Sequence, residues 1–452
     1  MGATNAHVLL ISYPSQGHVA PFMKLSHLLV DHEVKVTFVI TEFTHVRMKN
    51  ALPELGEKQH LMRLVSLPDG LESEDDRKDE RKLSSSIAQV LPGHLEDLIK
   101  KANQLGGDDD QITCVITDAA FMWALEIAEK MRLKRAVFWT SEPGLLASAL
   151  NIPKLLEAGI IDKNGTPRED GKIQLSPNVP ALSTSEFFWN WPENLEMQKT
   201  MFSYALAIQQ KMKVSNWLLC HWFHDLHPAA SDLLPNMLPI GPLLANEHPV
   251  GNLWREDLTC LSWLNEQPAG SVIYVAFGST SLVSISQHQF DQIALGLELA
   301  GRPFLWVIKS DLTKGFNPKY PDGFANGKIV QWAPQEKVLA HPSVACFLTH
   351  CGWNSTLESL SNAVPFLCWP QFGDQHYVQS CICDGWKVGL PLKKDDNGII
   401  TSHEIKRKIE ELFSDDDIRA NSLKLKNMAR ESVGKGGSSA KNLEYFIEQI
   451  KH

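Results

Sequence analysis

Short runs of Val, Ile and other apolar residues alternate with helical patterns along the first third of the chain. The apolar runs lie at 7–13, 34–40, 112–118 and 135–140. Between them, apolar residues recur at helical spacing from about 18 to 31 and near 121 to 131. Continuous apolar runs separated by helices are typical of strands in a parallel sheet that is covered on both faces. The pattern therefore predicts α/β architecture.

The same alternation restarts in the second half of the chain. Its apolar runs lie at 271–279, 304–309, 327–332, 345–350 and 364–369. The segment before them, LPIGPLLANEHPVGN at 238–252, is rich in Pro and Gly and is typical of a linker. A chain of 452 residues is also too long for one hydrophobic core. We therefore expect a domain at 1–240, a linker at 241–253 and a second domain at 254–452, with the last helix, at about 437–452, a candidate for packing back on the first domain.

Composition and charge narrow the class of protein. A hydrophobic share of 43% with 21% charged residues is typical of a folded globular protein. The formal charge of -10, without a dense block of Lys and Arg, argues against nucleic acid or an anionic membrane as partner. No apolar run is long enough for a membrane helix, and the first residues lack the basic segment of a signal peptide. The eight Cys contain no Cys-x-x-Cys pair, which favours free thiols in a reducing compartment. We expect a cytoplasmic monomer without stable membrane insertion.

Three strand-to-helix junctions carry polar side chains that could bind a ligand. They are YPSQGH at 13–18, FGST at 277–280 and THCGWNSTLES at 349–359. In open parallel sheets, ligands bind at the carboxyl ends of the strands, where the strand order reverses. At the third junction, Gly352 leads into a helix that begins near Asn354, and a helix N-terminus can bind an anion without Lys or Arg. The alternative is that Ser355 and Glu358 form a capping box that only starts the helix.

The first junction suggests a general base. His18 follows the turn at Gly17, and Asp118 ends the apolar run at 112–118. If both lie at one edge of the sheet, Asp118 can accept a hydrogen bond from one nitrogen of the imidazole, so that the other nitrogen takes a proton. By themselves, His18 could be an ordinary histidine beside a turn and Asp118 a helix cap.

The block from Trp332 to Gln375, WAPQEKVLAHPSVACFLTHCGWNSTLESLSNAVPFLCWPQFGDQ, resembles the 44-residue donor-binding signature of plant UDP-glycosyltransferases over its whole length. The resemblance extends to VAFGSTSLVSISQHQFDQIALGLELAGRPFLWVIK upstream and to YPSQGHVAPFMKLSHLL near the start. It is weakest from about 151 to 260. It implies a GT-B fold, in which two facing Rossmann-like domains with parallel sheets enclose an interdomain cleft, with the nucleotide sugar bound mainly by the second domain and the acceptor mainly by the first.

The resemblance also implies roles for individual residues. Trp332 corresponds to the residue that stacks on uracil, and Gln335 and Glu358 to those that bind the ribose. His350, Asn354 and Ser355 correspond to the residues that hold the diphosphate, together with Ser279 or Thr280. Asp374 and Gln375 correspond to those that bind the sugar hydroxyls. Thr140 resembles a further sugar contact, and Ala333 and Trp353 complete the set of donor-binding positions.

The function that the resemblance implies is transfer of glucose from UDP-glucose to a small, largely apolar hydroxylated acceptor of flavonoid, phenolic or terpenoid type. In that family the residues matching His18 and Asp118 form a catalytic dyad, the product is a β-O-glucoside with inverted configuration, and neither a cofactor nor a metal is needed. Gln at the position of Gln375 tends to accompany glucose, and His there galactose. Phe121, Met122 and the aromatic residues near 187–202 are candidates for the acceptor wall, with the hydrophobic core the favoured alternative for the aromatic group. Glu142 is interpreted as a solvated loop acid in preference to an acceptor contact.

Other functions are less consistent with the sequence. A metal-dependent glycosyltransferase would use an Asp-x-Asp motif, but the match in GGDDDQ at 106–111 precedes a strand and is typical of a solvated loop. Neither the Gly-x-Gly-x-x-Gly of a nicotinamide enzyme nor the Gly-x-Ser-x-Gly of a serine hydrolase occurs. A binding protein that has lost turnover remains the alternative, although it would be expected to lose His18 or Asp118. The chain departs from the family pattern at His221, where Asn is common, and at His227, where an acid is usual. We expect these departures to affect local packing and not catalysis.

Overall fold

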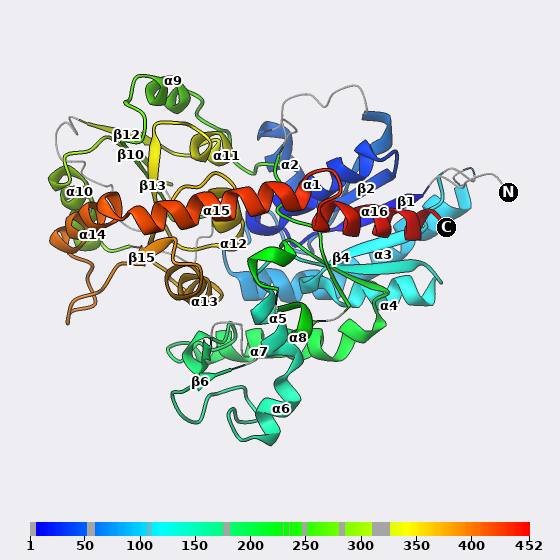
Figure 1. Ribbon diagram of the computed structural model, residues 1–452. Coiled ribbons are helices and arrows are strands. Elements are labelled where there is room, and N and C mark those ends of the chain that lie inside the picture. Colours follow the sequence, from blue (N-terminus) through cyan, green and yellow to red (C-terminus); the bar gives the residue numbers. More distant parts are fainter. Residues whose placement is uncertain are drawn as a thin grey trace. The chain divides into compact units, whose positions relative to one another are not determined.

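The computed structural model describes residues 6–51, 59–105, 107, 110–174, 181–228, 230–234, 236–245, 251–279, 285–309 and 326–452. The chain divides into two compact units (Figure 1). The first comprises Met1–Trp254 and Glu431–His452, and the second comprises Arg255–Arg430. This division does not test the domain limits expected from the sequence, at 240 and 254, which remain a prediction.

The first unit is built on a parallel sheet in the order β3-β2-β1-β4-β5-β8-β9. Its strands are β1 (His7–Ile11), β2 (Lys35–Thr41), β3 (Met62–Leu67), β4 (Cys114–Asp118), β5 (Lys134–Trp139), β8 (Trp217–Cys220) and β9 (Met237–Pro239). Its helices are α1 (Gln16–Asp31), α2 (Glu42–Ala51), α3 (Glu80–Leu105), α4 (Trp123–Lys130), α5 (Pro143–Leu150), α6 (Ile152–Glu157), α7 (Leu195–Lys211), α8 (Ala230–Leu233) and α16 (Ser438–Lys451). The strand order reverses between β1 and β4, which is where a ligand site is expected in such a sheet.

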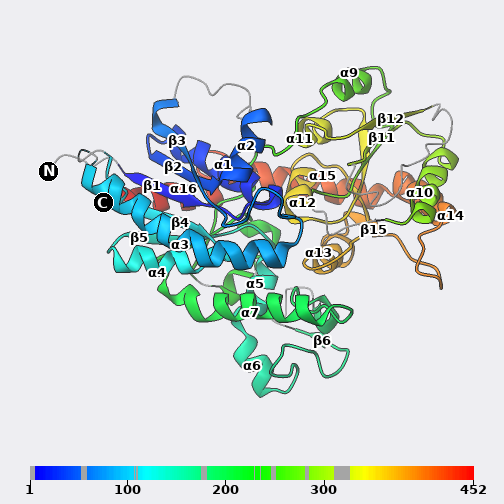
Figure 2. The ribbon, with the colours of Figure 1, turned by 180° about the vertical axis from the view of Figure 1, so that it is seen from behind.

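Helices cover both faces of this sheet, because every side chain of the interior strand β1 after His7 is apolar and buried. In β1, Val8 and Leu10 join the core on one face, and Leu9 and Ile11 join the core on the other. Residues of α1, α2 and α16 pack in the first core, and residues of α3 and α4 pack in the second (Figure 2). From α16, Leu443, Phe446, Ile447 and Ile450 are buried in the first core, where α16 packs against β9 and the Phe446 ring lies 5.4 Å from that of Trp217 on β8.

The second unit repeats the plan with a parallel sheet in the order β12-β11-β10-β13-β14-β15. Its strands are β10 (Val272–Ala276), β11 (Phe304–Val307), β12 (Gly327–Val330), β13 (Val344–Thr349), β14 (Phe366–Cys368) and β15 (Gly389–Pro391). Its helices are α9 (Thr259–Asn265), α10 (Gln287–Leu299), α11 (Gln335–Leu339), α12 (Trp353–Leu360), α13 (Gln375–Ser380), α14 (Ser402–Ser414) and α15 (Asp416–Val433), the last of which ends in the first unit. Here the order reverses between β10 and β13, the strands that precede FGST and THCGWNSTLES.

Minor elements complete the described chain. A two-stranded antiparallel sheet joins β6 (Lys172–Ile173) to β7 (Leu182–Ser183). Single turns lie at η1 (Gln59–Leu61), η3 (Ala119–Phe121), η4 (Thr184–Glu186), η5 (Met212–Val214), η6 (His224–Leu226) and η7 (Cys381–Gly385). No helix within the described ranges is both long and apolar enough to cross a membrane.

The predicted α/β class and the parallel strands are confirmed, with two local corrections. Charge-rich segments such as 71–82 and 413–419 are interpreted from the sequence as solvated loops, but Glu80 to Lys82 form the first turn of α3, and all of 413–419 except Asp415 is helical. Acids at the start of a helix are stabilised by its dipole, so such charge runs also suit helix N-termini. The aromatic group at 187–202 is core, as favoured: Phe187 and Trp189 stack at 4.5 Å and are 1% and 0% exposed.

Candidate active site

A histidine and an aspartate meet at the point where the first sheet reverses its strand order. The loop after β1 ends in α1, whose first turn contains His18, and Asp118 is the last residue of the neighbouring β4. Nδ1 of His18 lies 2.7 Å from Oδ2 of Asp118. The side chain of His18 is 34% exposed and that of Asp118 2%, so a substrate can reach the imidazole but not the carboxylate.

Asp118 is held by backbone donors on both oxygens. The N–H of Tyr13 donates to Oδ2 over 3.2 Å, and the N–H of Ala120 donates to Oδ1 over 2.9 Å as the cap of η3. From the sequence, Asp118 was either a helix cap or the partner of His18. In the structure it makes both contacts. Because three donors fix the carboxylate, the imidazole is fixed in turn.

The turn that carries His18 is anchored by Gln16, a residue that the motif reading passed over. Its Oε1 accepts from the N–H of Leu253 over 2.8 Å, and its Nε2 donates to Oδ1 of Asn252 over 3.2 Å. The N–H of His18 itself donates to the carbonyl of Ser15 over 2.9 Å. The segment just before the second unit therefore fixes the turn from which His18 projects.

Tyr13 lies beside the imidazole of His18, and Glu80 is close enough to interact with that ring electrostatically. The ring centroids of Tyr13 and His18 are 5.4 Å apart, and the Tyr13 hydroxyl is hydrogen-bonded to Oγ of Ser84 over 3.0 Å. Burial raises the pKa of Glu80 above its usual value, and the attraction of His18 offsets part of that rise. Burial also raises the pKa of the Tyr13 hydroxyl, which stays protonated. Phe121 and Met122, the expected acceptor contacts, are each only 3% exposed.

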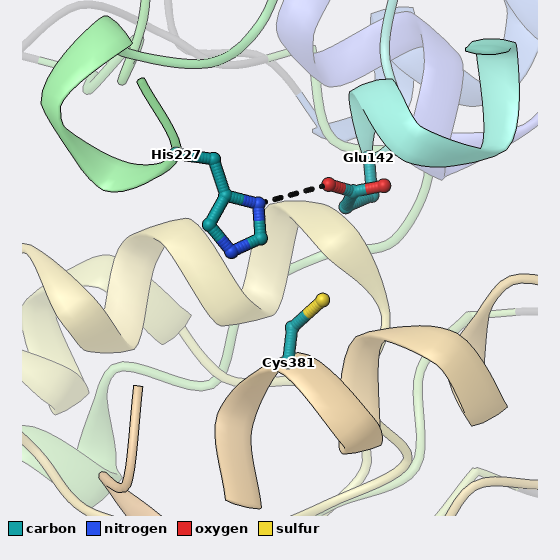
Figure 3. Close-up of side chains that lie close together, drawn as sticks. All are labelled: Glu142, His227 and Cys381. Carbon is teal, nitrogen blue, oxygen red and sulfur yellow. Dashed lines mark ion pairs between the residues drawn. The ribbon is translucent and has the colours of Figure 1, made fainter. Parts of the chain in front are cut away.

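Thr140 and Glu142 follow β5, at the same sheet edge as Asp118. Thr140 is half-buried. The interpretation of Glu142 as a solvated acid is wrong, because its side chain is 0% exposed. Its Oε2 accepts from the N–H groups of Gly144 and Leu145 at the start of α5, and its Oε1 lies 3.5 Å from Nδ1 of His227 (Figure 3). The helix N-terminus and the imidazole of His227 compensate the buried carboxylate.

His221, the other departure, has a local structural role. Its Nδ1 accepts a hydrogen bond from the N–H of Leu243 over 3.2 Å. Burial lowers its pKa well below the usual value, so the ring is neutral and can accept in this way.

In the second unit, Gln335 connects the other predicted ribose contact, Glu358, with the predicted diphosphate contact Ser355. Its Nε2 donates to Oε2 of Glu358 and to Oγ of Ser355, each over 2.8 Å, and its Oε1 accepts from the hydroxyl of Tyr274 over 3.2 Å. The capping-box alternative is therefore wrong: α12 is capped at Gly352, and Ser355 and Glu358 both turn to Gln335 on α11. Two helices converge on one group of polar atoms.

His350 is held in a narrow slot between two glycines. A Cβ atom at Gly278 would lie 2.5 Å from Nε2 of His350, and one at Gly352 would lie 2.4 Å from it. Gly278 also has φ +81°, a conformation that favours glycine. Burial lowers the pKa of His350 to about 4, although its hydrogen bond to the carbonyl of Ala276 opposes the change. The ring is therefore neutral near pH 7, and its one N–H is donated to the carbonyl of Ala276.

A buried lysine lies beside the predicted uracil-stacking residue, and the sequence reading missed it. Lys309 is 8% exposed, donates from Nζ to the carbonyl of Ser279, and places Nζ 5.9 Å from the centroid of the Trp332 ring. Ala333 is buried, and the carbonyl of Trp332 accepts from the N–H of Asp257 over 2.9 Å. A lysine that follows an apolar run gives little sequence signal, because most such lysines reach solvent.

The remaining predicted positions lie around the N-termini of α12 and α13. Trp353 and Asn354 belong to the first turn of α12, and Asp374 caps α13. Gln375 is 3% exposed, and its Oε1 accepts from the N–H groups of Gln371 and Phe372. Thr280 lies outside the described residues.

The Asp-x-Asp match falls mostly outside the described residues as well. Asp110, which is described, is exposed and forms an ion pair with Lys35, and its carbonyl accepts from Nδ1 of His7 over 2.8 Å. The eight cysteines are all free thiols, as predicted.

Comparisons with known proteins identify the family of the chain. A family model described as UDP-glucoronosyl and UDP-glucosyl transferase matches residues 23–433. UDP-glycosyltransferase 83A1 of Arabidopsis thaliana is 39% identical over 98% of this chain and 97% of its own length. UDP-glycosyltransferase 85A1 of the same plant is 31% identical, over 98% of this chain and 96% of its own. A solved structure of Phytolacca americana UGT2, complexed with UDP-2fluoro-glucose and pterostilbene, is 25% identical, covers 99% of this chain and 100% of that chain, and has a TM-score of 0.79. Because these matches run through both units, the chain belongs to the UDP-glycosyltransferases of family 1, enzymes with the GT-B fold.

Proposed function

We propose that the protein transfers glucose from UDP-glucose to a hydroxyl of a small, largely apolar acceptor of flavonoid, phenolic or terpenoid type, and that it makes β-O-glucosides by an inverting displacement. The observation that carries the proposal is the contact of 2.7 Å between His18 and Asp118. A relative that is 25% identical has been solved with a UDP-sugar analogue and a small molecule together, which supports this pairing of ligands.

In the proposed reaction His18 is the general base. With Asp118 ionised, the short contact is completed by a proton on Nδ1, so the lone pair of the imidazole lies on Nε2. Nε2 takes the proton of the acceptor hydroxyl as its oxygen attacks the anomeric carbon of glucose, and UDP leaves from the opposite face. Asp118 stabilises the imidazolium that forms.

The donor site is proposed to bind the diphosphate largely with neutral groups. Asn354 and Ser355 would donate to the phosphates at the N-terminus of α12, with Ser279 or Thr280 adding a hydroxyl. His350 would donate from its second nitrogen once the negative phosphate stabilises a second proton on the ring. The neutral state of His350 follows from the burial that lowers its pKa to about 4. A site of this kind suits a protein of formal charge -10.

The other donor residues are proposed to recognise the nucleoside and the sugar. Trp332, with Ala333 behind it, would stack on uracil, and Glu358 with Gln335 would accept from the ribose hydroxyls. The sugar would contact Asp374, Gln375, Trp353 and Thr140. Since Oε1 of Gln375 already accepts two backbone N–H groups, its Nε2 is the end that can donate to glucose.

We further propose that the enzyme acts as a cytoplasmic monomer and needs no metal. Eight free thiols suit a reducing compartment, and the donor groups named above can bind a diphosphate directly. If a metal were required, a chelator would abolish transfer.

The test is mass-spectrometric detection of glucosides from a pooled phenolic and terpenoid panel, with UDP-glucose and EDTA, for wild type and His18→Ala. Addition of one hexose by wild type alone supports the proposal. If both proteins are equally active, His18 is not the base. If wild type binds UDP-glucose but glucosylates nothing from a widened panel, the protein is a binding protein.

A further inference from the structure

A carboxylate beside His18 has no role in the proposed reaction. Glu80 is the first residue of α3 and is half-buried. Within the described part of the chain its carboxylate forms no hydrogen bond and no ion pair. Its neighbour Asp79, in contrast, accepts from the backbone N–H groups of Arg81 and Lys82. Glu80 is therefore not the residue that caps this helix.

The position of Glu80 follows from the face of α3 on which it lies. Glu80 and Ser84 are four residues apart, one turn along the same side of the helix. Ser84 is hydrogen-bonded to Tyr13 over 3.0 Å, and the Tyr13 ring lies 5.4 Å from that of His18. Leu83 and Ile87 anchor this end of the helix in the core that also contains Tyr13. The chain of contacts places Glu80 on the face of α3 that adjoins Tyr13, whose ring in turn adjoins that of His18.

Burial and charge are consistent with that position. Loss of solvent raises the pKa of Glu80, and electrostatic attraction to His18 lowers it in part. A carboxylate without hydrogen-bond donors is unfavourable away from water. Groups of this kind, close to a reacting side chain, are frequent where a ligand supplies the missing donors.

The surroundings indicate which ligand would do so. His18 and Glu80 both accept protons or hydrogen bonds, so two neighbouring hydroxyls on one molecule would serve both. Aromatic rings surround the pair: Tyr13 lies 5.8 Å from Phe121, and the hydroxyl of Tyr204 is close enough to interact electrostatically with Asp118 and Tyr13. Such walls suit a flat aromatic acceptor.

We propose that Glu80 binds the acceptor by accepting a hydrogen bond from a hydroxyl adjacent to the one that reacts, and that the enzyme therefore prefers catechol-type acceptors. The proposal rests on the proposed glucosyl transfer and adds the acceptor class to it. The competing role is purely electrostatic: a negative charge near His18 makes the imidazole a stronger base, whatever the acceptor.

The experiment compares three acceptors that differ only beside the reacting hydroxyl. Catechol offers a second hydroxyl, guaiacol replaces it with a methoxy group that cannot donate, and phenol has neither. Wild type, Glu80→Gln and Asp97→Asn are assayed with UDP-glucose for kcat and KM. Asp97 is an exposed acid on the same helix, so its variant removes one charge far from His18. UDP affinity and thermal unfolding show whether each variant is folded.

We expect wild type to prefer catechol, and Glu80→Gln to lower kcat/KM for catechol by about 10-fold, because the amide oxygen of Gln still accepts a hydrogen bond but lacks the charge that strengthens it. The values for phenol and guaiacol should change less than about threefold, and Asp97→Asn should resemble wild type. The proposal is overturned if wild type shows no preference for catechol, or if Glu80→Gln lowers kcat/KM equally for all three acceptors. Activity on the pooled panel without activity on catechol would overturn this inference and leave the proposed function standing, whereas inactivity on both would overturn both.

Discussion

The slot around His350 gives a prediction that needs no knowledge of the acceptor. A methyl group at Gly278 or at Gly352 would lie 2.5 or 2.4 Å from Nε2 of His350, well inside the closest approach that real Cβ atoms make. The imidazole would have to move in either variant. The two substitutions differ in the backbone, because Gly278 has φ +81° and Gly352 has φ -64°, which alanine adopts without strain.

The expected magnitudes separate these two effects. Displacing a donor from a charged phosphate costs about 1.5 to 3 kcal/mol, or about 10- to 100-fold in UDP affinity. Forcing alanine into a left-handed conformation costs about 1 to 2 kcal/mol of stability. Gly301 provides the control, because it has φ +63° and a Cβ there would meet nothing within 4 Å.

The assay is isothermal titration of each variant with UDP, with thermal unfolding measured in parallel. Gly278→Ala and Gly352→Ala should bind UDP 10- to 100-fold more weakly, whereas Gly301→Ala should bind as wild type does. Gly278→Ala and Gly301→Ala should both lose stability. The reasoning is refuted if Gly278→Ala and Gly352→Ala bind UDP normally, or if Gly301→Ala loses affinity to the same extent.

Three further predictions concern the dyad, acid stability and donor choice. Asp118→Asn should lower kcat by about 10²- to 10⁴-fold with UDP affinity unchanged, since the amide cannot stabilise the imidazolium; an unaltered kcat would remove Asp118 from the mechanism. The free energy of unfolding should fall as the pH drops from about 6.5 to about 4, because burial lowers the pKa of His7 and of His350 to about 4 and only the unfolded chain takes up protons in this range. Each histidine contributes about 3 kcal/mol at most, and chemical denaturation of His7→Gln should show a shallower slope; an equal slope would contradict the assignment. Gln375→His should shift the ratio of UDP-glucose to UDP-galactose turnover toward galactose, and an unchanged ratio would detach Gln375 from sugar choice.

Features that depend on the local pattern of residues could be predicted from the sequence. Apolar runs and glycine turns were sufficient to predict parallel strands and to select the junctions at His18, Gly278 and Gly352. The contact of His18 with Asp118 also depends on β1 lying beside β4, a pairing of segments about 100 residues apart that no local pattern specifies.

The errors share a physical cause, which is that distant partners decide the state of a polar group. Glu142 resembles a solvated acid until α5 and His227 are in place around it. Ser355 and Glu358 have capping-box spacing, but Gln335 from another helix takes both. A single sequence shows the spacing of residues along the chain, whereas these contacts join residues that are far apart in it.

The position of α16 has a consequence for synthesis of the protein. Leu443, Phe446, Ile447 and Ile450 complete a core that otherwise consists of residues before Trp254. Domains usually fold in order as they leave the ribosome. Here part of the apolar surface of the first unit stays uncovered until the second unit and then α16 have been translated. The nascent chain therefore exposes an aggregation-prone face for as long as the second unit takes to emerge, and chaperone contact is expected on β8 and β9 during that interval.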